Sequence, residues 1–352
     1  AAPGPRPARR DALSGRSGQR PPGAGRATAQ QVAEAAGVSI SAVSRTFTKD
    51  ASVSPRMRAR VLAAAEALGY RPNRLARGLM TGRTELVGLV STHFANPAFM
   101  DVFDLFTREL QRRGLRPLIA NLSEDGGADS ALDMMLQYSV DAVLIATSAP
   151  PEGFAESCAR AGLPVVHVFG RPGPQAVVPA VTVDNVAGGR LATEAMLARG
   201  LTRLAFLGGA ATDSSSIDRA DGFVQGLATA GLEPLAVEFT GDYSHEHGRS
   251  GLHALLDRHR PQAVFCGDDI LALGAVDACR ERGLVVPRDI GIVGFDDMPL
   301  AAWPGYRLTT IRQPMAEMVR HAIGEIAARL TDAGHPIKDR LFDIALVERE
   351  SL

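Results

Sequence analysis

Residues 28–45 have the sequence TAQQVAEAAGVSISAVSR, and this stretch decides how the front of the chain folds. Thr28 and Gln31 match a capping box, in which the hydroxyl accepts from the backbone N–H three residues on and the glutamine side chain returns to the backbone N–H of the cap. The pattern predicts a helix from Thr28 to about Ala36. Gly37 permits the tight turn that ends this helix.

The same stretch predicts a second helix, which Ser39 caps and which runs to about Phe47. Ala33, Gly37 and Val43 are spaced by four and six residues. The small side chain of Ala33 lets two helices cross closely, and Val43 buries the second helix against the first. This spacing is typical of a helix-turn-helix.

A third helix is predicted between the Ser54-Pro55 pair, a cap followed by proline at the first helical position, and Gly69. One face of this helix is apolar. The residues of this apolar stripe are Met57, Val61, Ala64, Ala65 and Leu68. The three helices together predict a small all-α bundle over residues 28–72.

The second helix is expected to present side chains away from the bundle, toward the base edges of a DNA major groove. Ile40 suits a thymine methyl group, and Arg45 can donate to guanine or to a phosphate. Ser41 and Ser44 lie on the same outer face. The cations expected to contact the phosphate backbone are Lys49, Arg56 and Arg58. An ordinary helical hairpin with a solvated basic face is the alternative.

Charge is distributed unevenly along the chain, although the net charge of all 352 residues is only −1. The first 83 residues hold 15 Lys and Arg against four Asp and Glu, a net charge of +11, so the remainder carries −12. A basic front part favours a polyanionic partner such as nucleic acid.

Two further segments flank the predicted bundle. Residues 1–27 contain five Pro and five Gly without apolar periodicity, which predicts a flexible tail. Residues 73–84 include a short basic stretch, Asn73 to Met80, which is expected to be largely unfolded on its own. The tail lacks the apolar core of a secretory signal, no run is long enough to span a membrane, and the three cysteines form no CxxC pair. A soluble cytoplasmic protein is therefore expected.

From Glu85 onward, strand-like runs alternate with helical ones, which predicts parallel sheets covered by helices on both faces. Roughly 270 residues exceed one comfortable core, so two similar lobes are expected, with a cleft between them for a small ligand. The strand-like runs begin at Leu86, Leu118, Val140, Val165, Val181, Leu204, Leu235, Ala263 and Ile290.

The chain resembles the lactose/galactose repressor family of bacterial transcription regulators from about residue 28 to the C-terminus. The ordered segments that carry the resemblance are Val32 to Ser39, Ala42 to Arg45, Leu68 to Asn73, Ala76 to Leu79, Val183 to Asn185, Ala272 to Ala275, Val293 to Asp297 and Leu308 to Pro314. The resemblance implies an all-α helix-turn-helix headpiece joined to a two-lobed α/β body like that of periplasmic sugar-binding proteins.

For the front part, the resemblance implies that Asn73 to Met80 forms a hinge helix and that Leu79 wedges into the minor groove of a bent duplex. The implied partner is a nearly palindromic operator bound by a homodimer or a tetramer. The predicted DNA-binding residues are Thr28, Ser39, Ile40, Ser41, Ser44, Arg45, Arg58, Asn73, Ala76 and Leu79.

For the body, the resemblance implies chain crossings near Asp184, Thr310 and Pro336. The expected lobes are an N-lobe of residues 85–183 and 311–335 and a C-lobe of residues 184–310 and 336–352. Carboxylates beside an arginine suit a polyhydroxyl ligand, so a sugar or sugar derivative is the expected effector, without a metal or other cofactor. The predicted effector-binding residues are Phe99, Asp184, Ser215, Arg219, Tyr243, Asp268, Asp296 and Gln313.

The sequence departs from the family at Gly267-Asp268-Asp269, where Ala-Asn-Asp is usual. An amide that donates and accepts has become a carboxylate that only accepts, so no relative's effector can be transferred to this chain. Asp269 and Asp297 are expected to cap or brace the adjacent helices.

The sequence thus predicts a DNA-binding transcriptional regulator, a repressor, whose operator affinity responds to an effector between the lobes. A carbohydrate-acting enzyme using the Asp-rich cleft is one alternative, with His245 and His247 as candidate metal ligands. These two side chains share no helix face, and the sequence has no nucleophile elbow or phosphate loop. A sugar-binding protein for transport is a second alternative, which leaves the basic front part without a role.

Overall fold

The computed structural model describes residues 27–48, 51–72, 82–92, 94, 96–122, 127–171 and 178–352. Contacts between Cα atoms group the chain into two compact units, residues 1–76, here called the head, and residues 77–352, here called the body. The predicted tail, apart from Ala27, and the predicted hinge helix lie outside the described residues.

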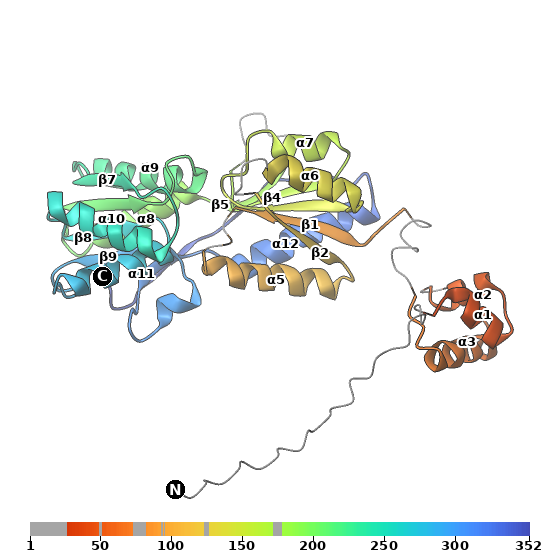
Figure 1. The fold of residues 1–352 in the computed structure, drawn as a ribbon. Helices are drawn as coiled ribbons and strands as arrows, with labels where there is room; N and C mark the ends of the chain where they lie inside the picture. Colours follow the sequence, from red (N-terminus) through yellow and green to blue (C-terminus); the bar gives the residue numbers. More distant parts are fainter. Residues whose placement is uncertain are drawn as a thin grey trace, which may run out of the picture. The chain divides into compact units, whose positions relative to one another are not determined.

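The described part of the head folds into α1 (Ala29–Ala36), α2 (Ile40–Thr46) and α3 (Pro55–Ala67) (Figure 1). The predicted capping box is present: the Thr28 hydroxyl accepts from the backbone N–H of Gln31, whose side chain accepts from the backbone N–H of Thr28 at 2.9 Å. Ser39 and Ser54 cap the next two helices, and Gly37 adopts a left-handed φ of 62° at the end of α1. These predictions are confirmed.

A small apolar core joins the three helices, and its buried members are Val32, Ala33, Ala36, Val43, Val61 and Ala65. The prediction that Leu68 belongs to this core is wrong, because α3 ends one residue earlier and Leu68 is 42% exposed. Tyr70 closes this edge of the core instead. Its backbone N–H donates to the Ala65 carbonyl at 2.8 Å, and its ring centroid lies 5.8 Å from that of Phe47.

The body contains two six-stranded sheets, one in each lobe. In the N-lobe the strand order is β11-β5-β4-β3-β1-β2, and all pairings are parallel. Helices α5 and α12 cover one face of this sheet, and α6 and α7 cover the other (Figure 1). The N-lobe elements are β1 (Leu86–Ser91), α5 (Ala98–Arg112), β2 (Arg116–Asn121), α6 (Gly127–Gln137), β3 (Ala142–Ala146), α7 (Phe154–Arg160), β4 (Val165–Val168), β5 (Ala180–Val183), α12 (Met315–Thr331) and β11 (Arg340–Phe342).

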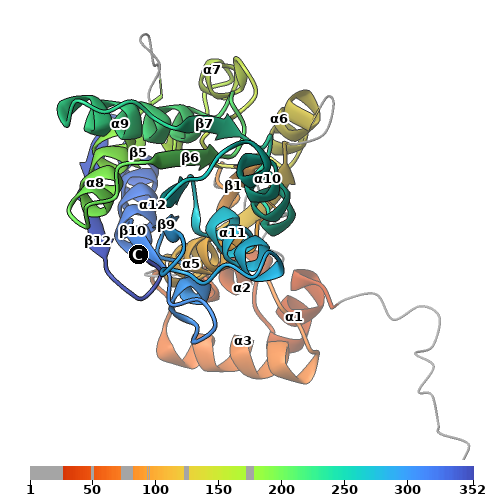
Figure 2. The ribbon, with the colours of Figure 1, turned by 90° about the vertical axis from the view of Figure 1, so that its left-hand side faces the viewer.

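In the C-lobe the strand order is β12-β10-β9-β8-β6-β7, and only β12 runs antiparallel to its neighbour. Helices α8 and α9 cover one face of the sheet and α10 and α11 the other (Figure 2). The C-lobe elements are α8 (Asn185–Leu197), β6 (Leu204–Gly208), α9 (Ser214–Thr229), β7 (Ala236–Phe239), α10 (His245–Arg258), β8 (Ala263–Cys266), α11 (Asp269–Glu281), β9 (Gly291–Asp296), the 3-10 helix η1 (Pro299–Ala302), β10 (Thr309–Arg312) and β12 (Ala345–Val347).

Alternation along the C-lobe strands sends side chains to opposite cores. Phe206 and Phe265 lie in the core under α8 and α9, whereas Leu207 and Val264 lie in the core under α10 and α11. Both faces of these strands are therefore apolar, as the sequence predicted for parallel strands covered on both sides.

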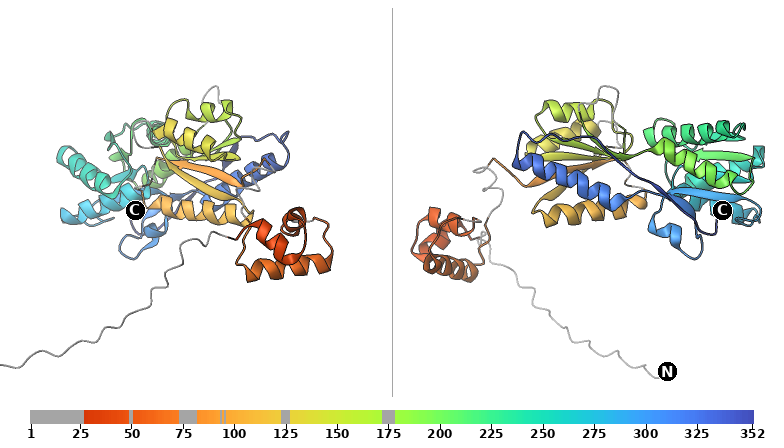
Figure 3. Two further views of the ribbon diagram at one scale, coloured as in Figure 1. Left: turned by 45° about the vertical axis from the view of Figure 1, so that its right-hand side comes forward. Right: turned by 180° about the vertical axis from the view of Figure 1, so that it is seen from behind.

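Two of the points at which the chain was expected to cross between the N-lobe and the C-lobe are displaced along the sequence. The chain passes from the C-lobe to the N-lobe after β10 ends at Arg312, slightly later than expected. The expected return near Pro336 is wrong, because β11 pairs with β5 of the N-lobe, where Arg340 lies opposite Val181. The Asp339 carboxylate also accepts from the Ala180 backbone N–H at 2.8 Å. The chain returns to the C-lobe only between β11 and β12 (Figure 3).

All three cysteines, Cys158, Cys266 and Cys279, are buried free thiols. Among the helices described, none is both long enough and apolar enough to cross a lipid bilayer.

Candidate functional site

One pocket of the body receives side chains from both lobes and has a cavity of about 50 Å³. It lies where the parallel strands end: Ser148 follows β3, Phe169 follows β4, and Asp268 follows β8. In open α/β sheets, ligands bind at this carboxyl edge of the strands. The lining residues are Asn96, Phe99, Val102, Ser148, Phe169, Ser215, Arg219, Tyr243, Asp268, Asp296, Gln313 and Met315.

Asp268 is 3% exposed and caps α11, because its carboxylate accepts from the backbone N–H of Leu271 at 2.8 Å. The second carboxylate oxygen accepts from the side-chain amide of Asn96, in the opposite lobe, at 3.0 Å. Burial raises the pKa of Asp268 to about 8, and the negative charge of Asp296 acts in the same direction. The position where the sequence departs from the family thus forms a direct bond between the lobes.

Arg219 is 5% exposed and lies over the ring of Phe295, with Cζ 3.6 Å from the ring centroid. Its Nε donates to the side chain of Asn185 at 2.9 Å, and its Nη1 donates to the carbonyl of Gly267 at 2.5 Å. Its Nη2 is 3.8 Å from the Asp296 carboxylate. Internal partners therefore hold the guanidinium in place, and one nitrogen faces the pocket carboxylate.

Asp296 ends β9 with a φ of 113°, a conformation that residues with a side chain rarely adopt. Gln313, which follows β10, donates from its side-chain nitrogen to the Asp296 carboxylate at 2.5 Å. Burial raises the pKa of Asp296, while the charge of Arg219 and the bond from Gln313 act against this rise.

Aromatic side chains form the remaining wall of the pocket. The rings of Phe99 and Phe169 meet edge to face with centroids 6.1 Å apart. The hydroxyl of Tyr243 shares a hydrogen bond with that of Ser216 at 2.6 Å, and burial raises the pKa of Tyr243. A Cβ on Gly209 would lie 2.6 Å from the Tyr243 ring, so glycine is required where the ring packs on the backbone.

The structure brings seven of the eight predicted effector-binding residues together around this pocket. These are Phe99, Ser215, Arg219, Tyr243, Asp268, Asp296 and Gln313. Asp184 is not among the lining residues, because its carboxylate caps α8 by accepting from the Ala187 backbone N–H at 2.8 Å.

Sequence reasoning missed five lining residues: Asn96, Val102, Ser148, Phe169 and Met315. Asn96, Ser148 and Phe169 each follow an N-lobe strand, so their position after the ends of parallel strands is a signal that could have found them. Val102 and Met315 lie on amphipathic helices, where nothing in the sequence separates pocket positions from core positions.

Asp269 and Asp297 brace the surrounding strands and loops, whereas the sequence predicted that they cap or brace the adjacent helices. The Asp269 carboxylate accepts from the Thr310 hydroxyl at 2.6 Å and from the Met298 backbone N–H at 2.8 Å. The Asp297 carboxylate pairs with Arg312 at 2.6 Å and with Arg349 at 2.5 Å.

The outer surface of the head presents the residues predicted for base contacts. Ile40, Ser41, Ser44 and Arg45 are exposed along α2, and the caps Thr28 and Ser39 are exposed as well. Ile40 is apolar yet 51% exposed. The predicted residues Asn73, Ala76 and Leu79 lie outside the described part of the chain.

Arg58 is directed into the head rather than outward. Its guanidinium donates to the backbone carbonyl of Thr46 at 2.9 Å and to that of Ala51 at 3.4 Å. It therefore braces the segment between α2 and α3, whereas Arg56 is exposed.

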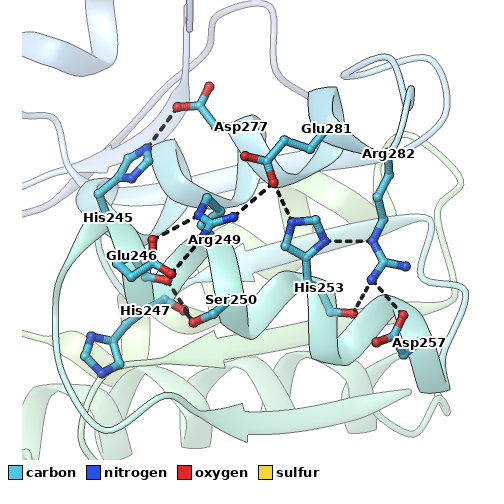
Figure 4. A network of polar contacts seen from close by, with 10 residues as sticks. All are labelled: His245, Glu246, His247, Arg249, Ser250, His253, Asp257, Asp277, Glu281 and Arg282. Atoms are coloured by element: carbon cyan, nitrogen blue, oxygen red, sulfur yellow. Dashed lines mark hydrogen bonds and ion pairs between the residues drawn. The ribbon is translucent and has the colours of Figure 1, made fainter.

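The histidines considered as metal ligands lie among polar contacts of α10 and α11 (Figure 4). His245 pairs with Asp277 at 2.9 Å, while His247 shares a hydrogen bond with the cap Ser244 at 2.8 Å. His253 lies between Glu281, at 2.7 Å, and Arg282, whose Nε donates to Nδ1 at 2.8 Å. Within the described ranges, no group of three or more His, Cys, Asp or Glu side chains is suited to hold a metal.

A helix-turn-helix head with an exposed second helix, attached to a two-lobed body with a polar pocket, defines the class of ligand-responsive transcription regulators. Comparisons with known proteins give the family. The model of bacterial regulatory proteins of the lacI family matches residues 28–73, and that of the periplasmic binding protein-like domain matches residues 193–352. The chain belongs to the LacI family of bacterial regulatory proteins.

The ribose operon repressor of Escherichia coli (strain K12) is 33% identical over 312 residues, which cover 87% of this chain and 93% of that protein. The crystal structure of the lac repressor dimer bound to operator and the anti-inducer ONPF is similar with a TM-score of 0.83 at 26% identity, covering 92% of this chain and 98% of the other. The CelR–cellobiose complex is similar with a TM-score of 0.70 at 29% identity, covering 93% and 100% of the two chains. The predicted family and fold class are confirmed, and the chain is a transcription regulator rather than an enzyme.

Proposed function

We propose that the chain is a cytoplasmic homodimeric repressor whose head binds a nearly palindromic operator and whose body pocket binds a sugar or sugar derivative. The observation that carries the proposal is the pocket in which Arg219, Asp268 and Asp296 converge with aromatic side chains at the carboxyl edge of the strands. Carboxylates and a guanidinium recognise hydroxyl groups, and rings cover the apolar faces of sugars.

The relatives support both halves of this proposal. One similar structure is a repressor dimer on its operator, and another is a regulator in complex with cellobiose. Two identical heads related by a two-fold axis would bind two half-sites, so the operator is expected to be nearly palindromic.

The small cavity supports a mechanism in which the lobes move. A sugar needs several times the observed 50 Å³, because ligand pockets usually enclose about 300–1,000 Å³. Direct bonds now join the lobes: Asn96 to Asp268, the Ser214 hydroxyl to the Ser148 carbonyl at 2.8 Å, and Arg171 to Asp218 at 2.7 Å. An effector would replace some of these bonds, and the resulting shift is expected to change operator affinity by about 5–150-fold.

Selection of operator sequences from random duplexes, followed by gel shifts across a salt series, tests the DNA-binding half. Arg45→Ala should change the preferred base at one position of each half-site. Arg56→Ala should weaken binding to all sequences and lower the salt slope by about one. Identical behaviour of the two variants would contradict the assignment of Arg45 to base contacts.

Asn73, Ala76 and Leu79 are proposed to complete the DNA contact. Leu79→Ala should reduce the bend that the protein induces in the DNA. An apolar side chain inserted between base pairs unstacks them and kinks the duplex, so its removal should leave the duplex straighter. A circular-permutation gel assay measures the bend angle, and an unchanged angle would remove the wedge role.

Thermal shifts with a panel of sugars and sugar derivatives test the effector half, because a ligand that binds only the folded body raises its melting temperature. Asp296→Asn should weaken binding of whichever sugar raises the melting temperature by at least about tenfold, since a hydrogen bond to a charged group contributes about 1.5–3 kcal/mol. Asp221→Asn is the matched control, because Asp221 is exposed on α9 and does not line the pocket. Equal binding by both variants would contradict the pocket assignment.

A further inference from the structure

The pocket has more acidic than basic side chains. Its acidic and basic lining residues are Asp268, Asp296 and Arg219, so its formal charge is −1 when both carboxylates are ionised. The other polar lining residues are neutral. Because ionised carboxylates are costly to bury without a cation, this excess bears directly on which ligand the pocket accepts.

The two carboxylates have different partners. Asp296 has Arg219 within 3.8 Å and the Gln313 amide at 2.5 Å. Asp268 is bonded only by the neutral N–H groups of Leu271 and Asn96, and the described part of the chain forms no ion pair with it. Among the described residues, Asp268 is therefore the pocket carboxylate without an ion-pair partner, although the charge of Arg219 still acts on it.

The donors around the pocket are already directed at protein acceptors. The amide nitrogen of Asn96 donates to Asp268, and that of Gln313 donates to Asp296. The Ser148 hydroxyl donates to the Asp213 carboxylate. Two of the three guanidinium nitrogens of Arg219 donate to Asn185 and Gly267. An anionic ligand would meet few donors and two carboxylates, whereas a ligand rich in donors would meet many acceptors.

We propose, building on the proposed function, that the effector is a polyhydroxylated amine, such as an amino sugar, whose ammonium group binds the Asp268 carboxylate. An ammonium group brings three N–H donors and one positive charge, so it can pair with the Asp268 carboxylate once that group has released its proton. Its hydroxyl groups donate to the Asp296 carboxylate and accept from the Nη2 of Arg219. Sugar acids and sugar phosphates are rejected, because their anions would face the Asp296 carboxylate, and the amide donors of Asn96 and Gln313 are already bonded to Asp268 and Asp296.

Ligand binding then releases a proton. Burial raises the pKa of Asp268 to about 8, so the carboxyl group holds a proton at pH 7 in the absence of a cation. The incoming ammonium replaces this proton: the carboxyl O–H bond breaks, the carboxylate pairs with the ammonium, and the proton passes to the buffer. A neutral sugar bound at the same place releases no proton.

The test uses the full-length protein and isothermal titration calorimetry at pH 7 with three matched sets: glucosamine, glucose and glucuronate, then the galacto and manno equivalents. In at least one set the hexosamine should bind about tenfold or more tightly than the hexose, and the uronate should not bind. Repeating the titration in phosphate and in Tris buffer should show release of about one proton per hexosamine, given the Asp268 pKa of about 8.

Asp268→Asn is the decisive variant, because it keeps the shape of the side chain and removes the charge. The ratio of hexosamine affinity to hexose affinity should fall about tenfold or more, and binding of the hexosamine should release no proton. Asp221→Asn, which removes an exposed charge on α9, should behave like the unaltered protein. Melting temperatures of both variants verify that they are folded.

Tighter binding of a hexose or a uronate than of the matching hexosamine would overturn the inference, as would a preference that survives Asp268→Asn. Absence of binding by every member of the panel would also overturn the ligand class. The proposed function is decided separately: operator binding in gel shifts, with release or enhancement by whichever sugar binds, supports it even if the amine plays no part.

Discussion

The Cα atoms of Gly189 and Gly222 face each other where α8 crosses α9. A Cβ on either glycine would lie 3.0 Å from the other's Cα. It would also meet backbone of the facing helix, 2.2 Å from the Arg219 carbonyl for Gly189 and 2.0 Å from the Val186 carbonyl for Gly222. The two helix backbones therefore touch, and this contact fixes the part of α9 that carries Arg219 into the pocket.

Gly222→Ala should destabilise the body by about 1–3 kcal/mol or more, because backbone atoms cannot move aside for the new methyl group. The direction of the stability change is informative, because replacing a glycine inside a helix by alanine normally stabilises a protein by about 1 kcal/mol. Urea unfolding of the full chain measures the effect. Gly305→Ala is the control, because a Cβ on Gly305 would meet no atom within 4 Å. Equal stability of the two variants would refute the close-contact explanation.

A similar close contact between two helix backbones occurs on the other face of the C-lobe sheet, where α10 crosses α11. A Cβ on Gly274 of α11 would lie 2.0 Å from the His245 carbonyl of α10. The sequence marks Gly274 only as part of a motif, Ala272 to Ala275, that carries the family resemblance. Why this position requires glycine depends on which helix crosses it, and helix crossings are not encoded in local patterns.

Local signals predicted the head well, because caps and turn residues such as Thr28, Ser39 and Gly37 act within four residues of their own position. The alternation of apolar runs predicted the two sheets. The strand β11 escaped prediction, because three residues carry no periodicity and Arg340–Phe342 is a strand only through its pairing with β5. Seven pocket residues followed from the family resemblance, whereas the interlobe bond between Asn96 and Asp268 required the three-dimensional structure.

Asp268 should make the body less stable as pH rises from about 4 to about 8. In this range, folded Asp268 holds a proton that the unfolded chain, with an aspartate pKa of about 3.9, has already released, so raising the pH favours unfolding. Burial raises the pKa values of Asp269 and Asp296 as well, and these groups act in the same direction.

Asp268→Asn should remove its share of this pH dependence. The drop in melting temperature between pH 5 and pH 8 should shrink by at least about 2–4 °C, the shift that 1 kcal/mol produces in a domain of this size. The asparagine oxygen can still accept from Leu271, and Asn96 can turn its amide to accept from the new side chain. Scanning calorimetry across the pH range measures both proteins, and parallel curves would show that Asp268 does not titrate there.

Thr310→Val should destabilise the body by about 1–3 kcal/mol. The Thr310 hydroxyl donates to the fully buried Asp269 carboxylate at 2.6 Å, and valine has the same shape without the donor. Of the two donors that the described residues give this side chain, the Met298 backbone N–H would remain, and a buried acceptor that loses a donor is costly.

Thr331→Val provides the reference for Thr310→Val, because Thr331 is exposed near the end of α12 and its hydroxyl bonds only within its own helix. Its effect on stability should stay within about 0.5 kcal/mol. Denaturant unfolding of the full chain compares the two variants, and a loss no greater for Thr310→Val than for Thr331→Val would show that Asp269 does not depend on this hydroxyl.

Arg58→Ala should loosen the head, although Arg58 is among the cations predicted from the sequence to contact DNA. Its guanidinium donates to the carbonyls of Thr46, the last residue of α2, and Ala51, which precedes α3, so its loss leaves two backbone acceptors without this partner. Hydrogen–deuterium exchange of peptides covering α2 should speed up in the full-length variant. Arg56→Ala, which removes the same charge from an exposed position, should leave this exchange unchanged while it weakens DNA binding. If exchange in α2 is unaltered by Arg58→Ala, the residue serves the phosphate contact first predicted for it rather than the fold.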